Sequence, residues 1–386
     1  MSRRTHGILI AAAAALVLCG ATIGPVALAA EVESKVDLQL WGRSKFDVHY
    51  DTANLRGYTD FASYISSDPD DYDGELNFNP RDTRFGFKGH LADGERTCGA
   101  VMEIDFYGDN ASNNLLPRLR LGYAFTQKGG FSLRAGQDWI PVAQQNPATI
   151  DFGILSWGGN LWWRVPQITA RYKMDSGLEL LASAMKHRVR SDTDTQERLP
   201  WLLGRVAYHG FLDGKGMVAV GGGFRSVEVD SIDYAPYLAA VEFNLPFTEQ
   251  ITLKGEFYTG AAIGEEFIHY GFEYNPSHPD DADDEGREIA ATGGFASLSF
   301  QATPRMSINV GGGMDDPDED DATGLEDGIP YTKNTVIFGN VKLQMNKHMG
   351  MGVEVMHFMT EQGEDANGDT IDWDGQRITG STWFAF

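Results

Sequence analysis

In many segments of this sequence apolar residues occupy every second position, and basic side chains occupy positions between them. We call each of these two alternating sets of positions a parity. In the stretch of residues 36–50, for example, Arg43 and Lys45 alternate with Ser44 and Phe46. Guanidinium and ammonium groups that line a narrow aqueous space favour anions, and guanidinium binds carboxylates in a bidentate manner. We therefore expect a polar face that attracts small anions, built on Arg43, Lys45, Arg84, Lys88, Arg118, Arg120, Arg134, Arg171, Arg205 and Arg225.

A second interpretation of these bases stays open. The same parity carries Asp47, Glu103 and Asp105, which could pair with the arginines and fill the interior without attracting a solute. The whole chain has a net charge of −24, so most of its acid lies outside this face. That acidity argues against nucleic acid as a partner, because phosphate binding needs basic surface.

The elements that carry these residues read as β-strands. Strict alternation of apolar and polar residues over this length is typical of a strand with two different faces. In residues 118–125, for instance, Leu119, Leu121, Tyr123 and Phe125 form the predicted apolar face. We count about 16 such segments in all, the usual size range for an outer-membrane barrel.

Short and long connectors alternate between the segments. The short ones cover residues 92–95, 127–130, 175–177, 212–216, 246–250, 302–305 and 346–350, and the long ones residues 51–80, 109–115, 139–163, 189–199, 260–288, 315–333 and 360–375. Bacterial transmembrane barrels have short periplasmic turns and longer outer loops. A soluble sandwich or propeller does not require this strict sequence of connectors. We therefore predict an all-β, antiparallel up-and-down transmembrane barrel.

The two ends of the sequence fit this interpretation. Residues 1–30 contain Arg3 and Arg4, an apolar run and the small-residue pattern Ala27-Leu28-Ala29, which predicts a secretory signal peptide. We expect residues 31–386 to form a single barrel domain in the outer membrane of a Gram-negative bacterium. The alternating segment at residues 377–386 ends on an aromatic side chain, with Phe384 and Phe386 on its predicted lipid face.

Several of these stretches resemble known outer-membrane porins. "RDTRFGFKG" at residues 81–89 is similar to a second-strand motif of sixteen-stranded porins, and "LRAGQDW" at residues 133–139 to the strand end before their third loop. "GRSKFDVHYD" and "RLRLGYAF" resemble the DcaP-like porins, although we expect the coiled coil that often begins those chains to be missing here. The resemblance implies a homotrimer, uptake of small and often anionic solutes, and recognition of a terminal Phe by the barrel-assembly machinery.

The resemblance also implies that a third loop folds into the barrel and narrows it. The candidate is the long connector at residues 139–163, which is rich in aromatic residues and contains one acid. We predict that its constriction residues are Trp139, Asp151, Phe152 and Trp157. Trp162 and Trp163, at the end of the loop, are instead interpreted as part of the aromatic belt at the membrane interface.

Acidic runs in the outer loops are expected to be solvated surface. One of them, "DANGD", spaces oxygen ligands around a glycine as calcium loops do, so Asp365, Asn367 and Asp369 are candidate calcium ligands. Divalent ions that bridge these loops to lipopolysaccharide phosphates are a looser alternative. No other cofactor is expected.

The sequence therefore predicts a porin that passes small anionic or polar solutes by diffusion, with preference for carboxylates or dicarboxylates. We find no Gly-x-Ser-x-Gly and no His-Glu-x-x-His pattern, so we do not expect an enzyme. The competing hypothesis is an adhesin or receptor barrel that acts through its acidic surface loops.

Overall fold

The computed structural model describes residues 36–56, 62–108, 115–188, 195–229, 231–268, 273–276, 286–325, 329–364 and 370–386. Within these ranges the chain is almost entirely β-structure, and no helix is long and apolar enough to cross a membrane. The strands of the wall are β1 (Asp37–Asp51), β4 (Glu75–Asn79), β5 (Arg84–Asp93), β6 (Arg96–Asp105), β7 (Arg118–Lys128), β8 (Phe131–Trp139), β9 (Arg164–Lys173), β10 (Leu178–Met185), β11 (Thr195–His209), β12 (Met217–Val229), β13 (Ile232–Tyr234), β14 (Tyr237–Pro246), β15 (Ile251–Ala261), β18 (Ala290–Thr303), β19 (Met306–Pro317), β20 (Lys333–Gln344), β21 (Met349–Glu364) and β22 (Thr370–Ala385).

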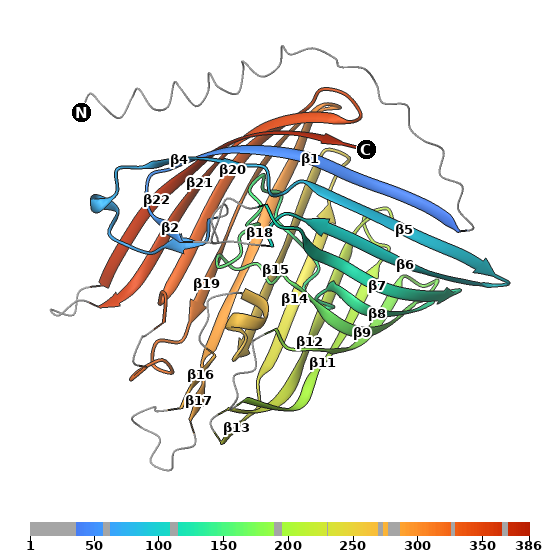
Figure 1. Ribbon diagram of the computed structural model, residues 1–386, viewed down its shortest axis with the longest axis horizontal. Helices are drawn as coiled ribbons and strands as arrows, with labels where there is room; N and C mark the ends of the chain where they lie inside the picture. Colours follow the sequence, from blue (N-terminus) through green and yellow to red (C-terminus); the bar gives the residue numbers. More distant parts are fainter. Residues whose placement is uncertain are drawn as a thin grey trace.

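These strands form a closed antiparallel barrel with 16 positions around the wall. β4 and β5 share one position because both pair with β1, and β13 and β14 share another because both pair with β12. The chain runs around the barrel in sequence order, so that β22 returns to lie beside β1 (Figure 1). The predicted fold class is confirmed.

The closing contact is a regular antiparallel ladder from Arg43 opposite Ala385 to Asp51 opposite Arg377. Phe386 extends it, because its backbone N–H donates to the Gly42 carbonyl and its carbonyl accepts from the Gly42 N–H. Phe384 and Phe386 both point outward and are exposed, as the alternation predicts. Closure leaves no unpaired strand edge facing lipid.

The outer face of the barrel is apolar. Val220, Val241 and Phe257 lie side by side on β12, β14 and β15, and each is about half exposed. The polar residues of the opposite parity, such as Asp47 and Arg205, are buried inside. The barrel needs this arrangement, since lipid contacts one face of every strand and the lumen contacts the other.

The predicted faces are wrong at one place, in β7. The pairing of β6 with β7 shifts between Glu103 and Ile104, which oppose Leu121 and Leu119 respectively. This irregularity reverses the parity of the rest of β7. Tyr123 and Phe125 therefore point into the lumen, where Arg134 and Lys88 stack on their rings.

The connectors differ in length at the two ends of the barrel. The short turns cover residues 94–95, 129–130, 174–177, 210–216, 247–250, 304–305 and 345–348. The opposite end carries the longer loops, with the small elements β2 (Leu55–Arg56), β3 (Tyr64–Ile65), η2 (Pro69–Asp71), η3 (Gly264–Ile268), β16 (Tyr274–Asn275) and β17 (Arg287–Glu288). The predicted loop at residues 360–375 is too long, because β21 and β22 continue as a ladder to Glu364 and Thr370.

A charge on the outer face should destabilise the barrel. We predict that Val241→Arg lowers the free energy of unfolding by about 2–4 kcal/mol, because an arginine near the middle of a lipid-facing strand must leave water. Guanidinium unfolding of the protein refolded in lipid vesicles measures this effect. Val241→Leu is the matched control and should unfold with the wild type; equal stability of both variants would contradict the assigned outer face.

Candidate functional site

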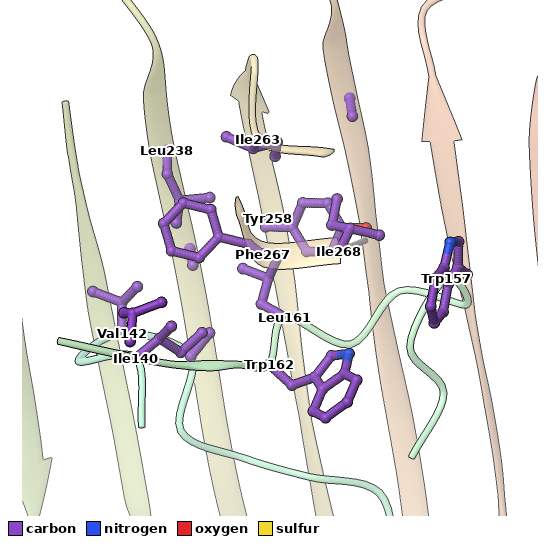
Figure 2. Packing of buried hydrophobic residues seen from close by; sticks show 14 of the residues in the cluster. Ile140, Val142, Trp157, Leu161, Trp162, Leu238, Tyr258, Ile263, Phe267 and Ile268 are labelled. Atoms are coloured by element: carbon purple, nitrogen blue, oxygen red, sulfur yellow. The ribbon is translucent and has the colours of Figure 1, made fainter. Parts of the chain in front are cut away.

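The connector between β8 and β9, residues 140–163, folds into the lumen; we call it the inward loop. It contributes Ile140, Val142, Leu161 and Trp162 to a buried cluster inside the barrel (Figure 2). The loop approaches the wall very closely at Gly159, where a Cβ atom would lie 2.2 Å from the Gly294 carbonyl oxygen. The predicted third-loop insertion is thus present in the structure.

Carboxylates of the wall hold the inward loop through its backbone. Glu354 on β21 accepts the N–H groups of Ile150 and Asp151, each at 2.7 Å. Glu256 on β15 accepts the N–H of Leu161 at 2.6 Å. These three short hydrogen bonds join the loop backbone to β15 and β21 and so fix the path of the loop.

Further contacts hold the loop along the same part of the wall. Glu242 on β14 accepts the N–H of Gln144 at 2.9 Å. On β20, Asn340 donates to the Ala148 carbonyl at 2.9 Å and Asn334 donates to the Trp157 carbonyl at 2.7 Å. The loop therefore lies against β14–β21. The alternation of apolar and polar residues predicts that these side chains face the lumen. It does not predict which group each of them binds.

A second segment also folds inward, and the sequence analysis missed it. η3, within a connector interpreted as an outer loop, places Phe267 and Ile268 toward Leu161 of the inward loop (Figure 2). The backbone N–H of Trp162 donates to the Phe267 carbonyl at 3.0 Å. The apolar residues of "AAIGEEFI" at residues 261–268 were the available signal.

Charged groups at the loop end surround η3. Arg225 on β12 contacts Glu266 at 2.7 Å and Glu273 at 3.3 Å. Burial and the nearby Glu266 carboxylate raise the pKa of Glu273, while Arg225 opposes this shift. Arg225 is thus occupied by an ion-pair cluster that fixes η3.

The lumen contains a cavity of about 300 Å³ beside the inward loop, which we call the basic cavity. Its basic residues are Arg43, Lys45, Arg84, Arg120, Arg164 and Lys342, and its acids are Asp82 and Asp151. Phe152 of the inward loop lines it as well, with the guanidinium carbons of Arg84 and Arg120 each 5.8 Å from the ring centroid. Four residues predicted from parity therefore meet here, together with the predicted loop residue Phe152.

Most of these bases contact carboxylates, in line with the second interpretation offered by the sequence. Asp82 contacts Arg43, Lys45 and Arg84 at once. Arg120 contacts Glu103 at 2.6 Å and Asp105 at 2.8 Å. Pairing does not remove the excess of bases over acids along the cavity wall.

The other predicted bases lie elsewhere. Arg118 binds Asp105, and Lys88 stacks on Phe125; neither base is among the residues that line the basic cavity. Arg205 is buried between Glu179 and Glu242. The remaining two, on β8 and β9, line a second cavity of about 310 Å³ and contact acids on their own side of the wall: Arg134 with Asp138 and Arg171 with Glu179.

The predicted constriction residues have different surroundings. Trp139 lines both cavities, whereas Trp157 packs against the wall and lines neither. Asp151 lines the basic cavity but is held by Arg377, whose Nη1 lies 3.0 Å from its carboxylate.

The belt interpretation of the two tryptophans is wrong. Trp162 is buried inside the barrel against Phe152, with ring centroids 6.1 Å apart. Trp163 packs against Trp162 and lies under the Arg188 guanidinium, 3.7 Å from the ring centroid. Both rings lie inside the barrel, because they belong to the end of the inward loop, directly before β9.

Two predictions fall outside the described residues. These are the signal peptide at residues 1–30 and the calcium candidates Asp365, Asn367 and Asp369. Within the described ranges, no group of three or more His, Cys, Asp or Glu side chains is placed to hold a metal ion. The calcium hypothesis therefore stays a prediction.

A closed barrel of 16 strands with an apolar exterior, a polar lumen and an inward loop defines the fold of the outer-membrane porins. The described structure is similar to the outer membrane channel DcaP of Acinetobacter baumannii, with a TM-score of 0.74 and 19% identity over 93% of this chain and 100% of that chain. It is also similar to the anion-selective porin from Comamonas acidovorans, with a TM-score of 0.65 and 12% identity over 91% and 100% of the two chains.

A further similar structure is OmpT of Vibrio cholerae in its trimer form, with a TM-score of 0.57 and 8% identity over 92% of this chain and 100% of that chain. No family model matches the sequence. No curated protein matches it either. The structural neighbours thus show that this chain shares their fold.

The anchors of the inward loop lead to a prediction. Glu354→Gln replaces one acceptor oxygen by an N–H donor and leaves a loop N–H unpaired, which costs about 1–3 kcal/mol. We expect a loosened loop, seen as noisier single-channel current and a lower melting temperature. Glu361→Gln, at the outer end of the same strand, is the control; identical current noise in both variants would show that Glu354 does not hold the loop.

Proposed function

We propose that this protein is a porin that passes small hydrophilic solutes by diffusion and prefers anions. The observation that carries the proposal is the lining of the basic cavity. In the described structure this lining contains two acids, Asp82 and Asp151, and six bases: Arg43, Lys45, Arg84, Arg120, Arg164 and Lys342. A passing anion gives up part of its hydration and gains attraction from these fixed charges, while a cation meets net repulsion. No chemical step is involved.

The position of the wall acids supports this proposal. Glu242, Glu256 and Glu354 are buried and accept hydrogen bonds from the inward loop, and none of the three lines the basic cavity. The bases thus have more influence on a solute than the net charge of −24 suggests. The similarity to the anion-selective porin of Comamonas acidovorans agrees with this balance.

We also infer a homotrimer, as in the trimer form of the Vibrio cholerae relative. Contacts of the acidic outer loops with lipopolysaccharide, and recognition of Phe386 by the barrel-assembly machinery, are further parts of the proposal. Carboxylates and dicarboxylates are the solutes that guanidinium groups would select best.

The reversal potential in a potassium chloride gradient tests the anion preference. We expect the refolded wild type in a planar bilayer to favour chloride. Arg84→Gln should lower the chloride-to-potassium permeability ratio about fivefold, because one charge near the ion path contributes on the order of 1 kcal/mol. Asp82 keeps Arg43 and Lys45 as partners in this variant, so the wall should remain intact.

Lys128→Gln is the matched control, since Lys128 is exposed and pairs with Glu95 at the short-turn end. It should leave the permeability ratio unchanged. A wild type that prefers potassium would overturn the anion preference. A barrel without stepwise conductance would favour the adhesin or receptor hypothesis.

A further inference from the structure

Arg164 differs from the other arginines of the basic cavity. It is the first residue of β9, directly after Trp162 and Trp163, and only 6% of it is exposed. In the described part of the chain no carboxylate lies within ion-pair distance of its guanidinium, and its Nη1 has no hydrogen-bond partner. Arg43, Arg84 and Arg120 all contact carboxylates.

Aromatic rings surround the Arg164 guanidinium. Its central carbon lies 4.7 Å from the ring centroid of Trp139, 5.5 Å from that of Trp162 and 5.7 Å from that of Trp163. Such contacts stabilise a desolvated cation. They provide neither a hydrogen-bond acceptor for Nη1 nor a counter-charge, which a buried cation needs to balance its loss of water.

The charges near Arg164 do not supply the missing compensation. Arg120, Arg118 and Arg84 act on it from β7 and β5, together with the carboxylate of Asp105. Asp105 already holds Arg118 and Arg120, each at 2.8 Å. The field at the Arg164 guanidinium is therefore positive, and an anion that enters the cavity would be attracted most where this compensation is lacking.

The cavity also has apolar surface beside its bases. Trp139, Phe152, Ile154 and Trp162 line it together with Arg164. Its two acids are engaged, Asp82 with three bases and Asp151 with Arg377. A guest that fits this lining has a carboxylate for the guanidinium and a hydrocarbon part for the rings.

We propose that Arg164 is the main contact of a saturable binding site for the carboxylate of a small organic acid within the basic cavity. This inference rests on the proposed function, because it places the site in the conducting path, and it goes further by making the channel solute-specific. The Arg164 guanidinium donates hydrogen bonds to the carboxylate, Arg84 and Arg120 add positive charge, and the indole and phenyl rings contact the body of the acid. An acid with a larger apolar body binds more tightly than acetate.

Single-channel recording tests the site. Benzoate added to one side of a potassium chloride bilayer should interrupt the chloride current of the wild type, and the blocked fraction should saturate. Acetate should require a higher concentration. Arg164→Gln should raise the half-blocking concentration of benzoate at least tenfold. For Arg164→Lys this concentration should lie between those of the wild type and Arg164→Gln, because lysine keeps the charge but not the forked donor.

Arg134→Gln is the matched control, because Arg134 lines the second cavity and is paired with Asp138. Benzoate should block the chloride current of this variant at the same concentration as in the wild type. Open-channel conductance in potassium chloride alone shows whether Arg164→Gln leaves the pore intact. Equal benzoate block in Arg164→Gln and wild type, or no block in an anion-selective wild type, would overturn the site and leave the proposed function standing.

A readout without current separates the two proposals further. Trp139, Trp162 and Trp163 lie beside Arg164, so titration of the refolded protein with cyclohexanecarboxylate, which does not absorb with indole, should change its tryptophan fluorescence saturably. A saturable change that Arg164→Gln abolishes supports the site even in a protein that does not conduct. The absence of any change in the wild type counts against the site.

Discussion

The closing ladder between β1 and β22 is the contact on which the rest of the structure depends. Lipid offers no hydrogen bonds, so an open sheet edge at this depth would leave a row of unpaired backbone groups. Closure also determines what each face can contain. Once the wall is continuous, every second side chain is enclosed, and residues as polar as Asp47, Arg205 and Arg377 become interior residues.

An enclosed polar interior must balance its charges. In this chain the acids that hold the inward loop and most bases of the basic cavity lie on different sides of the lumen. Glu242, Glu256 and Glu354 bind backbone N–H groups of the inward loop on the side of β14–β21. The bases of β1, β5, β7 and β9 face the basic cavity. Because the loop lies over the acids, it separates them from the path of a solute, and the lumen is more basic toward that solute than a count of its residues suggests.

Alternation in the sequence predicted the wall, its faces and the end of the chain with Phe384 outside, because these depend on local period and on lipid contact alone. It failed for Tyr123 and Phe125, since a single irregular pairing in β7 reverses a face without any change in composition. It also failed for Trp162 and for η3. The path of an inward loop is determined by contacts with strands far along the chain, and residue order does not specify those contacts.

The same reasoning explains why parity selected Arg205 and Arg225 as pore residues but not Arg164. Parity reports which side of the wall a residue is on, whereas availability to a solute depends on pairing. Arg205 lies between Glu179 and Glu242, and Arg225 between Glu266 and Glu273. Glu256 is buried like Arg164 and has no basic partner in the described structure, but the Leu161 N–H satisfies one of its oxygens. Within the described residues Arg164 packs against aromatic rings and has no carboxylate at ion-pair distance, and it lines the basic cavity, whereas Glu256 does not. Of these two groups, Arg164 is therefore the one that an anion in the cavity can neutralise.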